Sequence, residues 1–167
     1  MKIEVFYCKN ARRNQEACAE CPPAKIILKL FEAGGFVNWK PDRKVAGDSY
    51  ETGYDLMVDL TNGGVAKNFT IVSGTLQEGR YVHCWLEHED WVVDFSNGKQ
   101  RIYGKKYFYE QAKVDKKGLK SLTASQWRRK VQELASEEET AVRQTVRQAV
   151  RQDRPGKAAP EAELRGS

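Results

Sequence analysis

Apolar and polar side chains alternate over residues 2–7, and this alternation places Ile3, Val5 and Tyr7 on one face. A period of two is typical of a half-buried β-strand. The stretch that follows, residues 9–20, is polar, and we assign no element to it. The beginning of the chain therefore predicts one strand and a connection.

An apolar run over residues 24–33 predicts the first helix. Pro22 and Pro23 stand immediately before it, and a glycine pair begins at Gly34. Proline is tolerated in the first turn of a helix because the first N–H groups have no partner there, and glycine commonly ends a helix. Cys21 is therefore expected at or beside a helix N-terminus.

Residues 36–68 are rich in Gly, Asp and Asn and hold only short apolar pieces, so we leave their structure open. From residue 69 the pattern changes to runs of β-branched, aromatic and aliphatic residues over 69–76, 81–87 and 91–95, with a polar turn at 88–90. Runs of this kind, bounded by turn residues, predict three antiparallel strands in meander order.

The remainder of the chain is expected to be largely helical. Aromatic residues over 106–112 predict a short helix or strand packed on the sheet, and residues 123–150 predict a helix after a Thr/Ser cap. Within it, a valine followed by Arg-Gln recurs every four residues from Val142. This narrow stripe is typical of a solvated helix or a weak coiled-coil contact, which would permit self-association. Residues 153–167 are small and polar and are predicted to be disordered.

Together these elements predict an α+β domain over residues 1–135, in which the N-terminal helix packs on an antiparallel sheet, followed by an extended helix over 136–152. The 167 residues suffice for one domain with its own core. The net charge of +5 is spread among acidic residues without a nucleic-acid motif, so we expect a solvated surface and no nucleic-acid partner. The sequence shows no signal peptide or membrane span, which predicts a cytoplasmic protein with no membrane contact.

His83 is one of two histidines, and it lies on a predicted strand rather than in a surface loop. Asp94 follows eleven residues later on the returning strand, so the imidazole and the carboxylate can meet across the hairpin. A carboxylate in that position fixes the tautomer of the imidazole and stabilises the imidazolium. A core histidine with a turn aspartate would show the same spacing. Glu87, on the same hairpin, is interpreted as a solvated strand residue.

The stretch from Gly74 to Ser96 reads Gly-Thr-Leu-x-x-Gly-x-x-Val-His-Cys-Trp-Leu-Glu-x-x-x-Trp-Val-Val-Asp-Phe-Ser. This pattern resembles the small bacterial members of the papain-like and transglutaminase-like cysteine peptidase superfamily, and the likeness extends from Thr70 to Val114. The resemblance implies a papain-like fold and a thiol-dependent acyl-transfer enzyme, a cysteine peptidase or amidase more than a transglutaminase. Its substrate would be a peptide, amide or ester, and it implies no cofactor and no metal.

Such a site needs a thiol, and a thiolate is favoured at a helix N-terminus and beside an imidazolium. Cys21 meets the first condition. The run from Asn14 to Cys21 is similar to the Asn-Gln-x-x-Cys-x-x-Cys run of papain-like peptidases. The resemblance makes Cys21 the nucleophile and places Gln15 where the family has its oxyanion donor. Cys18 and Cys8 are weaker candidates for the nucleophile.

Three other interpretations remain open. The pair Cys18-x-x-Cys21 also resembles the redox motif of glutaredoxins, in which both thiols cycle through a disulfide. Alternatively, Cys8, Cys18 and Cys21 can hold a structural zinc ion together with Cys84 or His83, because Cys-x-x-Cys suits tetrahedral zinc. A third possibility is a catalytically inactive binding domain of the same fold.

Overall fold

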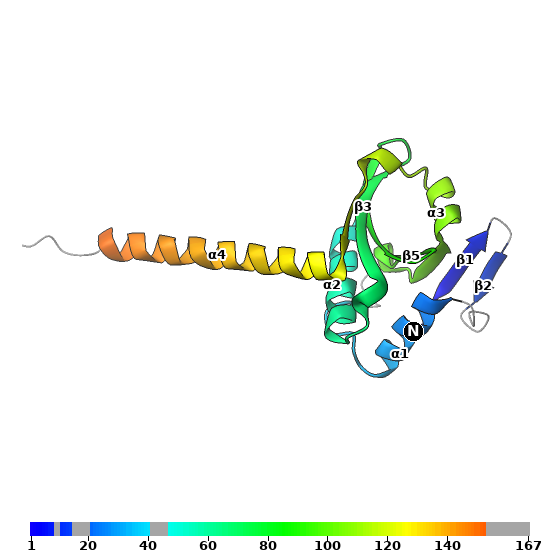
Figure 1. The fold of residues 1–167 in the computed structure, drawn as a ribbon, viewed down its shortest axis with the longest axis horizontal. Helices are drawn as coiled ribbons and strands as arrows, with labels where there is room; N and C mark the ends of the chain where they lie inside the picture. The colour runs from blue at the N-terminus through cyan, green and yellow to red at the C-terminus, as the bar shows by residue number, and fades with distance from the viewer. Residues whose placement is uncertain (9–10, 15–20, 41–46, 153–167) are drawn as a thin grey trace, which may run out of the picture. The chain divides into compact units, whose positions relative to one another are not determined.

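The structure, a computed structural model, describes residues 1–8, 11–14, 21–40 and 47–152 (Figure 1). Two of the predicted residues, Gln15 and Cys18, and the predicted tail lie outside these ranges. The described chain forms a compact unit that ends at Arg128, and a second unit that begins at Arg129 within the long last helix.

Seven strands of the described residues form one sheet in the order β2-β1-β6-β5-β4-β3-β7. Their bounds are β1 Glu4–Cys8, β2 Ala11–Asn14, β3 Phe69–Leu76, β4 Tyr81–His88, β5 Trp91–Asp94, β6 Arg101–Gly104 and β7 Lys120–Thr123. Neighbouring strands are antiparallel except for β1 and β6, which run parallel. The predicted antiparallel sheet is therefore wrong in this one pair, and the sheet is mixed. The α+β class is confirmed.

The meander of β3, β4 and β5 is confirmed. In β3 and β4, Phe69 pairs with His88 and Leu76 with Tyr81, so the two strands match over their full length. The polar turn leads from His88 back to Trp91, which pairs with it. Because alternate residues of a strand face opposite sides of the sheet, one face of this meander builds a core. Its buried members are Val72, Trp85, Val92 and, from α3, Phe108.

The described residues contain four helices: α1 Pro22–Glu32, α2 Ser49–Asn62, α3 Lys105–Gln111 and α4 Ala124–Gln152. Three short 3-10 turns connect other elements, at η2 Ala66–Asn68, η3 Ser96–Gly98 and η4 Lys116–Gly118. The predicted helix after Pro22 is confirmed as α1, and the predicted C-terminal helix is confirmed as α4. None of the described helices combines the length and the apolar character needed to cross a membrane.

The helix that lies against β3 and β4 is α2, in the region that the sequence left open (Figure 1). Its second turn approaches β4 closely, since a Cβ atom added at Gly53 would lie 3.1 Å from Cys84 Sγ. A larger residue would therefore push the helix away from the strand. The prediction named α1 as the helix packed on the sheet, and α2 takes this central place.

Asp59, on α2, fastens the connection between α1 and α2. Its carboxylate is fully buried and accepts hydrogen bonds from Trp39 N at 2.8 Å, from Asn38 N at 3.1 Å and from Asn38 Nδ2 at 2.6 Å. The ring of Trp39 packs on Phe95 with centroids 5.1 Å apart. Since Phe95 directly follows β5, the connection is held against the end of that strand.

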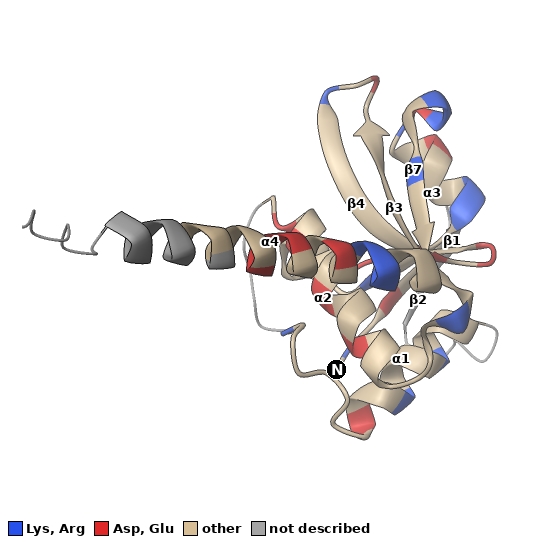
Figure 2. Cartoon of the chain, turned by 60° about the vertical axis from the view of Figure 1, so that its left-hand side comes forward, with Lys and Arg blue, Asp and Glu red and all other residues tan. Residues whose placement is uncertain are grey.

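The long helix α4 carries its charges in blocks, as Figure 2 shows. Basic residues at 128–130 are followed by acidic residues at Glu133 and 137–139. Glu133 lies 3.7 Å from both Arg129 and Lys130, an exposed contact of the i,i+3 and i,i+4 type. Such exposed pairs contribute only a few tenths of a kcal/mol, so the helix surface is polar without being strongly stabilised by these pairs.

We predict that Asp59→Ala lowers the free energy of unfolding by about 3 kcal/mol, because buried N–H groups of Asn38 and Trp39 lose their acceptor. Urea denaturation measures this change. Glu110→Ala, which removes an exposed carboxylate from α3, is the control and should change the free energy by less than about 0.5 kcal/mol. Equal effects of the two variants would contradict the role assigned to Asp59.

Candidate functional site

His83 and Asp94 meet across the β4–β5 hairpin. His83 Nε2 lies 3.0 Å from Asp94 Oδ2, and the two side chains are 16% and 15% exposed. The register pairs Leu86 with Val93, so Asp94 falls diagonally across from His83, within reach of the imidazole. The hydrogen bond that the spacing predicted is therefore present, at a partly buried position.

The other oxygen of Asp94 is held by the turn that follows β5. Ser96 N donates to Asp94 Oδ1 at 3.1 Å. Burial alone would raise the pKa of this carboxyl, but the hydrogen bond and charge of His83 and the hydrogen bonds from Ser96 outweigh it, so the pKa of Asp94 lies below its ordinary value. Asp94 is therefore a fixed, ionised acceptor for the imidazole.

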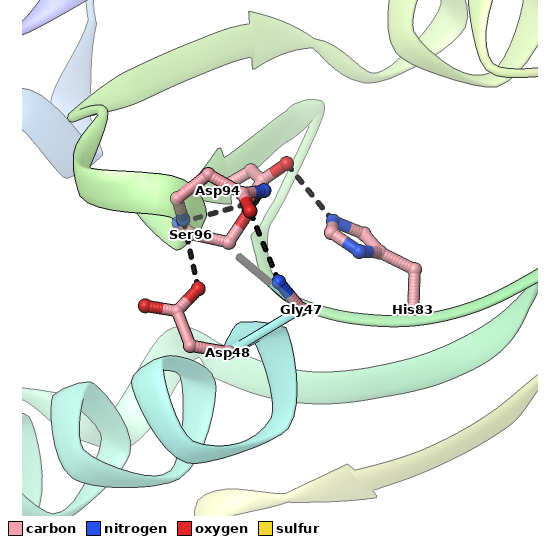
Figure 3. A network of polar contacts seen from close by, with 6 residues as sticks. Gly47, Asp48, His83, Asp94 and Ser96 are labelled. Atoms are coloured by element: carbon pink, nitrogen blue, oxygen red, sulfur yellow. Dashed lines mark hydrogen bonds and ion pairs between the residues drawn. The ribbon is translucent and has the colours of Figure 1, made fainter. Parts of the chain in front are cut away.

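The same turn is tied to the start of α2 (Figure 3). Asn97 N donates to Asp48 Oδ1 at 2.8 Å, and Gly47 N donates to Asn97 Oδ1 at 3.2 Å. Asn97 adopts a left-handed conformation with φ of 55°, which asparagine tolerates better than most residues. Asp48 makes no cap bond to its own helix, because its carboxylate faces the turn. The start of α2 is thereby joined, through residues 94–97, to the His83–Asp94 pair.

Trp85 and Glu87 continue the row of side chains that begins with His83 on one face of β4. The ring of Trp85 stacks on that of His83, with centroids 6.1 Å apart and planes 26° apart. Trp85 Nε1 donates to Glu87 Oε1 at 3.0 Å, and the same carboxylate accepts from Tyr109 OH at 2.5 Å and from Lys105 Nζ. Glu87 is buried, so its interpretation as a solvated residue is wrong. Two of its three donors, Lys105 and Tyr109, come from α3, which the strand pattern did not reveal.

Cys21 occupies the N-cap of α1, as the sequence predicted, and it is fully buried. Cys84, the other cysteine described with its side chain, is also buried. Burial, and secondarily the charge of Asp94, raise the pKa of the Cys84 thiol to about 12, so Cys84 is a packing residue rather than a nucleophile. The roles predicted for Cys21 and Gln15 remain predictions, as do the redox and zinc alternatives that depend on Cys18.

Sequence reasoning missed the residues that support the pair rather than form it. These are Asp48, Asn97 and Tyr109, together with the supporting role of Ser96; Glu87 was considered and was assigned to the solvent. One signal was available: an Asp-Ser dipeptide before the apolar piece at 54–60 is a common helix start, which would have predicted α2 and its Asp48 cap. The contact between Asp48 and Asn97 spans forty-nine residues and has no local signature.

Comparison with known proteins returned no match to this chain among family models, curated proteins or solved structures. Within the described part of the chain, no group of three or more His, Cys, Asp or Glu side chains is arranged to hold a metal ion. The chemical interpretation of the site therefore depends on the geometry of His83, Asp94 and their neighbours.

We predict that Asp94→Asn makes the free energy of unfolding depend less steeply on pH in the acid range. A folded-state pKa below the ordinary 3.8 means that the unfolded chain binds the proton more readily. The stabilisation by ionised Asp94 is therefore complete above pH 3.8 and is lost as the pH falls from there through the lower folded-state pKa. Urea denaturation across this range should show a steep loss in the wild type and a shallower one in the variant. The exposed control Asp115→Asn should keep the steep profile.

A second prediction concerns Glu87→Gln. Burial first, and then the hydrogen bond and charge of Glu87, raise the pKa of Tyr109. Removing the charge while keeping the shape should lower the pKa of Tyr109 toward its ordinary value, measured by NMR of ¹³Cζ-labelled tyrosine. An unchanged Tyr109 titration in the folded variant would contradict the contact.

Proposed function

We propose that this protein is a thiol-dependent acyl-transfer enzyme, of the cysteine peptidase or amidase type, with Cys21 as nucleophile, His83 as general base and Asp94 as the orienting carboxylate. The observation that carries the proposal is the 3.0 Å contact between His83 Nε2 and an Asp94 carboxylate that is itself anchored by Ser96 N. A histidine held by an anchored, ionised carboxylate is suited to proton transfer.

The orientation of the imidazole supports this role. Because Asp94 accepts from Nε2–H, the favoured neutral tautomer leaves Nδ1 as the basic atom. In the proposed reaction Nδ1 takes the proton of the Cys21 thiol, and the thiolate attacks the carbonyl carbon of a peptide, amide or ester. The carbonyl oxygen becomes an oxyanion, the leaving amine or alcohol takes the proton back from His83, and water or an amine resolves the thioester.

The start of α1 favours a thiolate at Cys21. A helix N-terminus stabilises negative charge through its dipole and its unpaired N–H groups. Pro22 and Pro23 carry no N–H, so the N–H of Cys21 itself and the side-chain amide of Gln15 are the proposed oxyanion donors. Cys21 is fully buried in the structure, so substrate binding in this proposal has to open a path to its sulfur.

The arrangement of the meander also supports a papain-like or transglutaminase-like fold. His83 and Asp94 come from consecutive antiparallel strands, β4 and β5, and the helix α2 lies against β4. We assign the fold to this class as part of the proposal, on the residues of the stretch from Gly74 to Ser96.

We predict that iodoacetamide at pH 7 alkylates Cys21 faster in the wild type than in His83→Ala, by roughly thirtyfold, since an unassisted thiol of pKa about 8.5 is only about 3% thiolate at this pH. Peptide mapping by mass spectrometry measures the rate at each cysteine. Asp94→Asn should give an intermediate rate, because the imidazole remains but loses its orienting acceptor.

Cys84 is the internal control for this experiment. It is buried like Cys21 and adjacent to His83 in sequence, but its raised pKa predicts slow alkylation in every variant. Cys21 labelling that is independent of His83 would refute the triad. A Cys18–Cys21 disulfide with dithiol-exchange activity would replace it with the redox function, and one zinc ion per chain would replace it with a structural metal site.

A further inference from the structure

A pocket of about 310 Å³ lies where the end of α2, η2 and the start of α4 meet. Five of its lining residues carry polar side chains: Thr61, Lys67, Thr123, Ser125 and Arg128. All of them belong to the unit that ends at Arg128. The volume falls within the range of small-molecule sites and exceeds what a single inorganic anion fills.

The charge of the pocket has one sign. Lys67 and Arg128 line it, and no Asp or Glu is among its lining residues. Both side chains belong to exposed residues, and neither forms an ion pair within the part of the chain that the structure describes. Two cations from separate elements therefore converge on one cavity without a carboxylate to balance them, which favours an anionic ligand.

Hydroxyl groups supply the matching polar contacts. Thr123 and Ser125 line the pocket, with their oxygens 3.2 Å apart. Thr123 Oγ1 donates to Gln126 Oε1 at 3.0 Å, so Ser125 is the hydroxyl of this pair whose proton can turn toward a ligand. The oxygen of Thr61 is buried and has no hydrogen-bond partner among the described residues. An unpaired buried hydroxyl is destabilising, and a ligand in the pocket removes that cost when the Thr61 side chain turns its hydroxyl toward it.

The pocket is separate from the His83–Asp94 site. Asp48, which is hydrogen-bonded to the turn beside the His83–Asp94 pair, directly precedes the first residue of α2. Thr61 lies in the last turn of the same helix. A helix of fourteen residues is about 21 Å long. The two places therefore lie at opposite ends of α2, and none of the pocket residues named above belongs to the proposed triad.

We propose that this pocket binds the phosphate group of a small phosphorylated molecule. A phosphate monoester carries close to two negative charges, which match Lys67 and Arg128, and its oxygens accept hydrogen bonds from guanidinium, ammonium and hydroxyl groups alike. The rest of the volume accommodates the organic part of the molecule. This inference is independent of the proposed acyl-transfer activity.

The test uses the full-length chain with inorganic phosphate as the probe, at constant ionic strength set with sodium chloride. Thermal unfolding at increasing phosphate should raise the Tm of the wild type, by roughly 3–6 °C when phosphate is ten times its Kd. The charge-reversed double variant Lys67→Glu, Arg128→Glu should lose this rise. A matched double variant, Lys106→Glu, Lys117→Glu, makes the same change in net charge at exposed positions outside the pocket and should keep it.

Thr61→Val separates binding from folding. Without phosphate its Tm should equal or exceed that of the wild type, because the unpaired hydroxyl is gone, and its phosphate-dependent rise should be smaller. The proposal is overturned if phosphate raises no Tm at any concentration, or if the rise is the same in the pocket variant and in the wild type. If the phosphate-dependent rise in Tm is lost equally in the control variant Lys106→Glu, Lys117→Glu, the rise is a general charge effect, and the proposal is likewise overturned.

Discussion

The carboxylate of Asp94 is the constraint on which the geometry of the site depends. One of its oxygens bonds His83 on the neighbouring strand, and the other bonds Ser96 N in the turn that ends β5. The N–H of the next residue, Asn97, donates a hydrogen bond to Asp48 Oδ1 at the start of α2. A single ionised side chain therefore fixes the imidazole, shapes the turn and brings a helix to the edge of the site.

The β4–β5 hairpin could be predicted from the sequence because its information is local. The strands have the period and the turn residues of a meander, and the eleven-residue spacing of His83 and Asp94 then follows from the register. The strands β2, β6 and β7 have four residues each, too few to show a period, and they lack the continuous apolar run that marks β5, which is equally short. The parallel contact of β1 with β6 joins residues ninety-seven positions apart, as with Glu4 and Arg101, and no local pattern encodes it.

The helix α2 was missed for a different reason. Its buried positions include Thr52, Gly53 and Asp59, so its inner face does not show a continuous apolar stripe. Gly53 lowers helix propensity, yet the close approach of Cys84 Sγ requires it. Asp59 appears polar in the sequence, yet its donors arrive from Asn38 and Trp39. Local propensity was overridden here by tertiary contacts.

Three buried or half-buried carboxylates share one structural task. Asp59 holds the connection before α2, Glu87 holds α3 against β4, and Asp94 holds the turn after β5. Each acceptor is supplied with several donors, because an unpaired buried charge would destabilise the fold by several kcal/mol. These bonds fasten the less regular parts of the chain to the regular sheet. His83 is therefore held from two sides, by Trp85 and Glu87 along its own strand and by Asp94 across the hairpin, and the proton transfer proposed for it requires an imidazole that keeps one orientation.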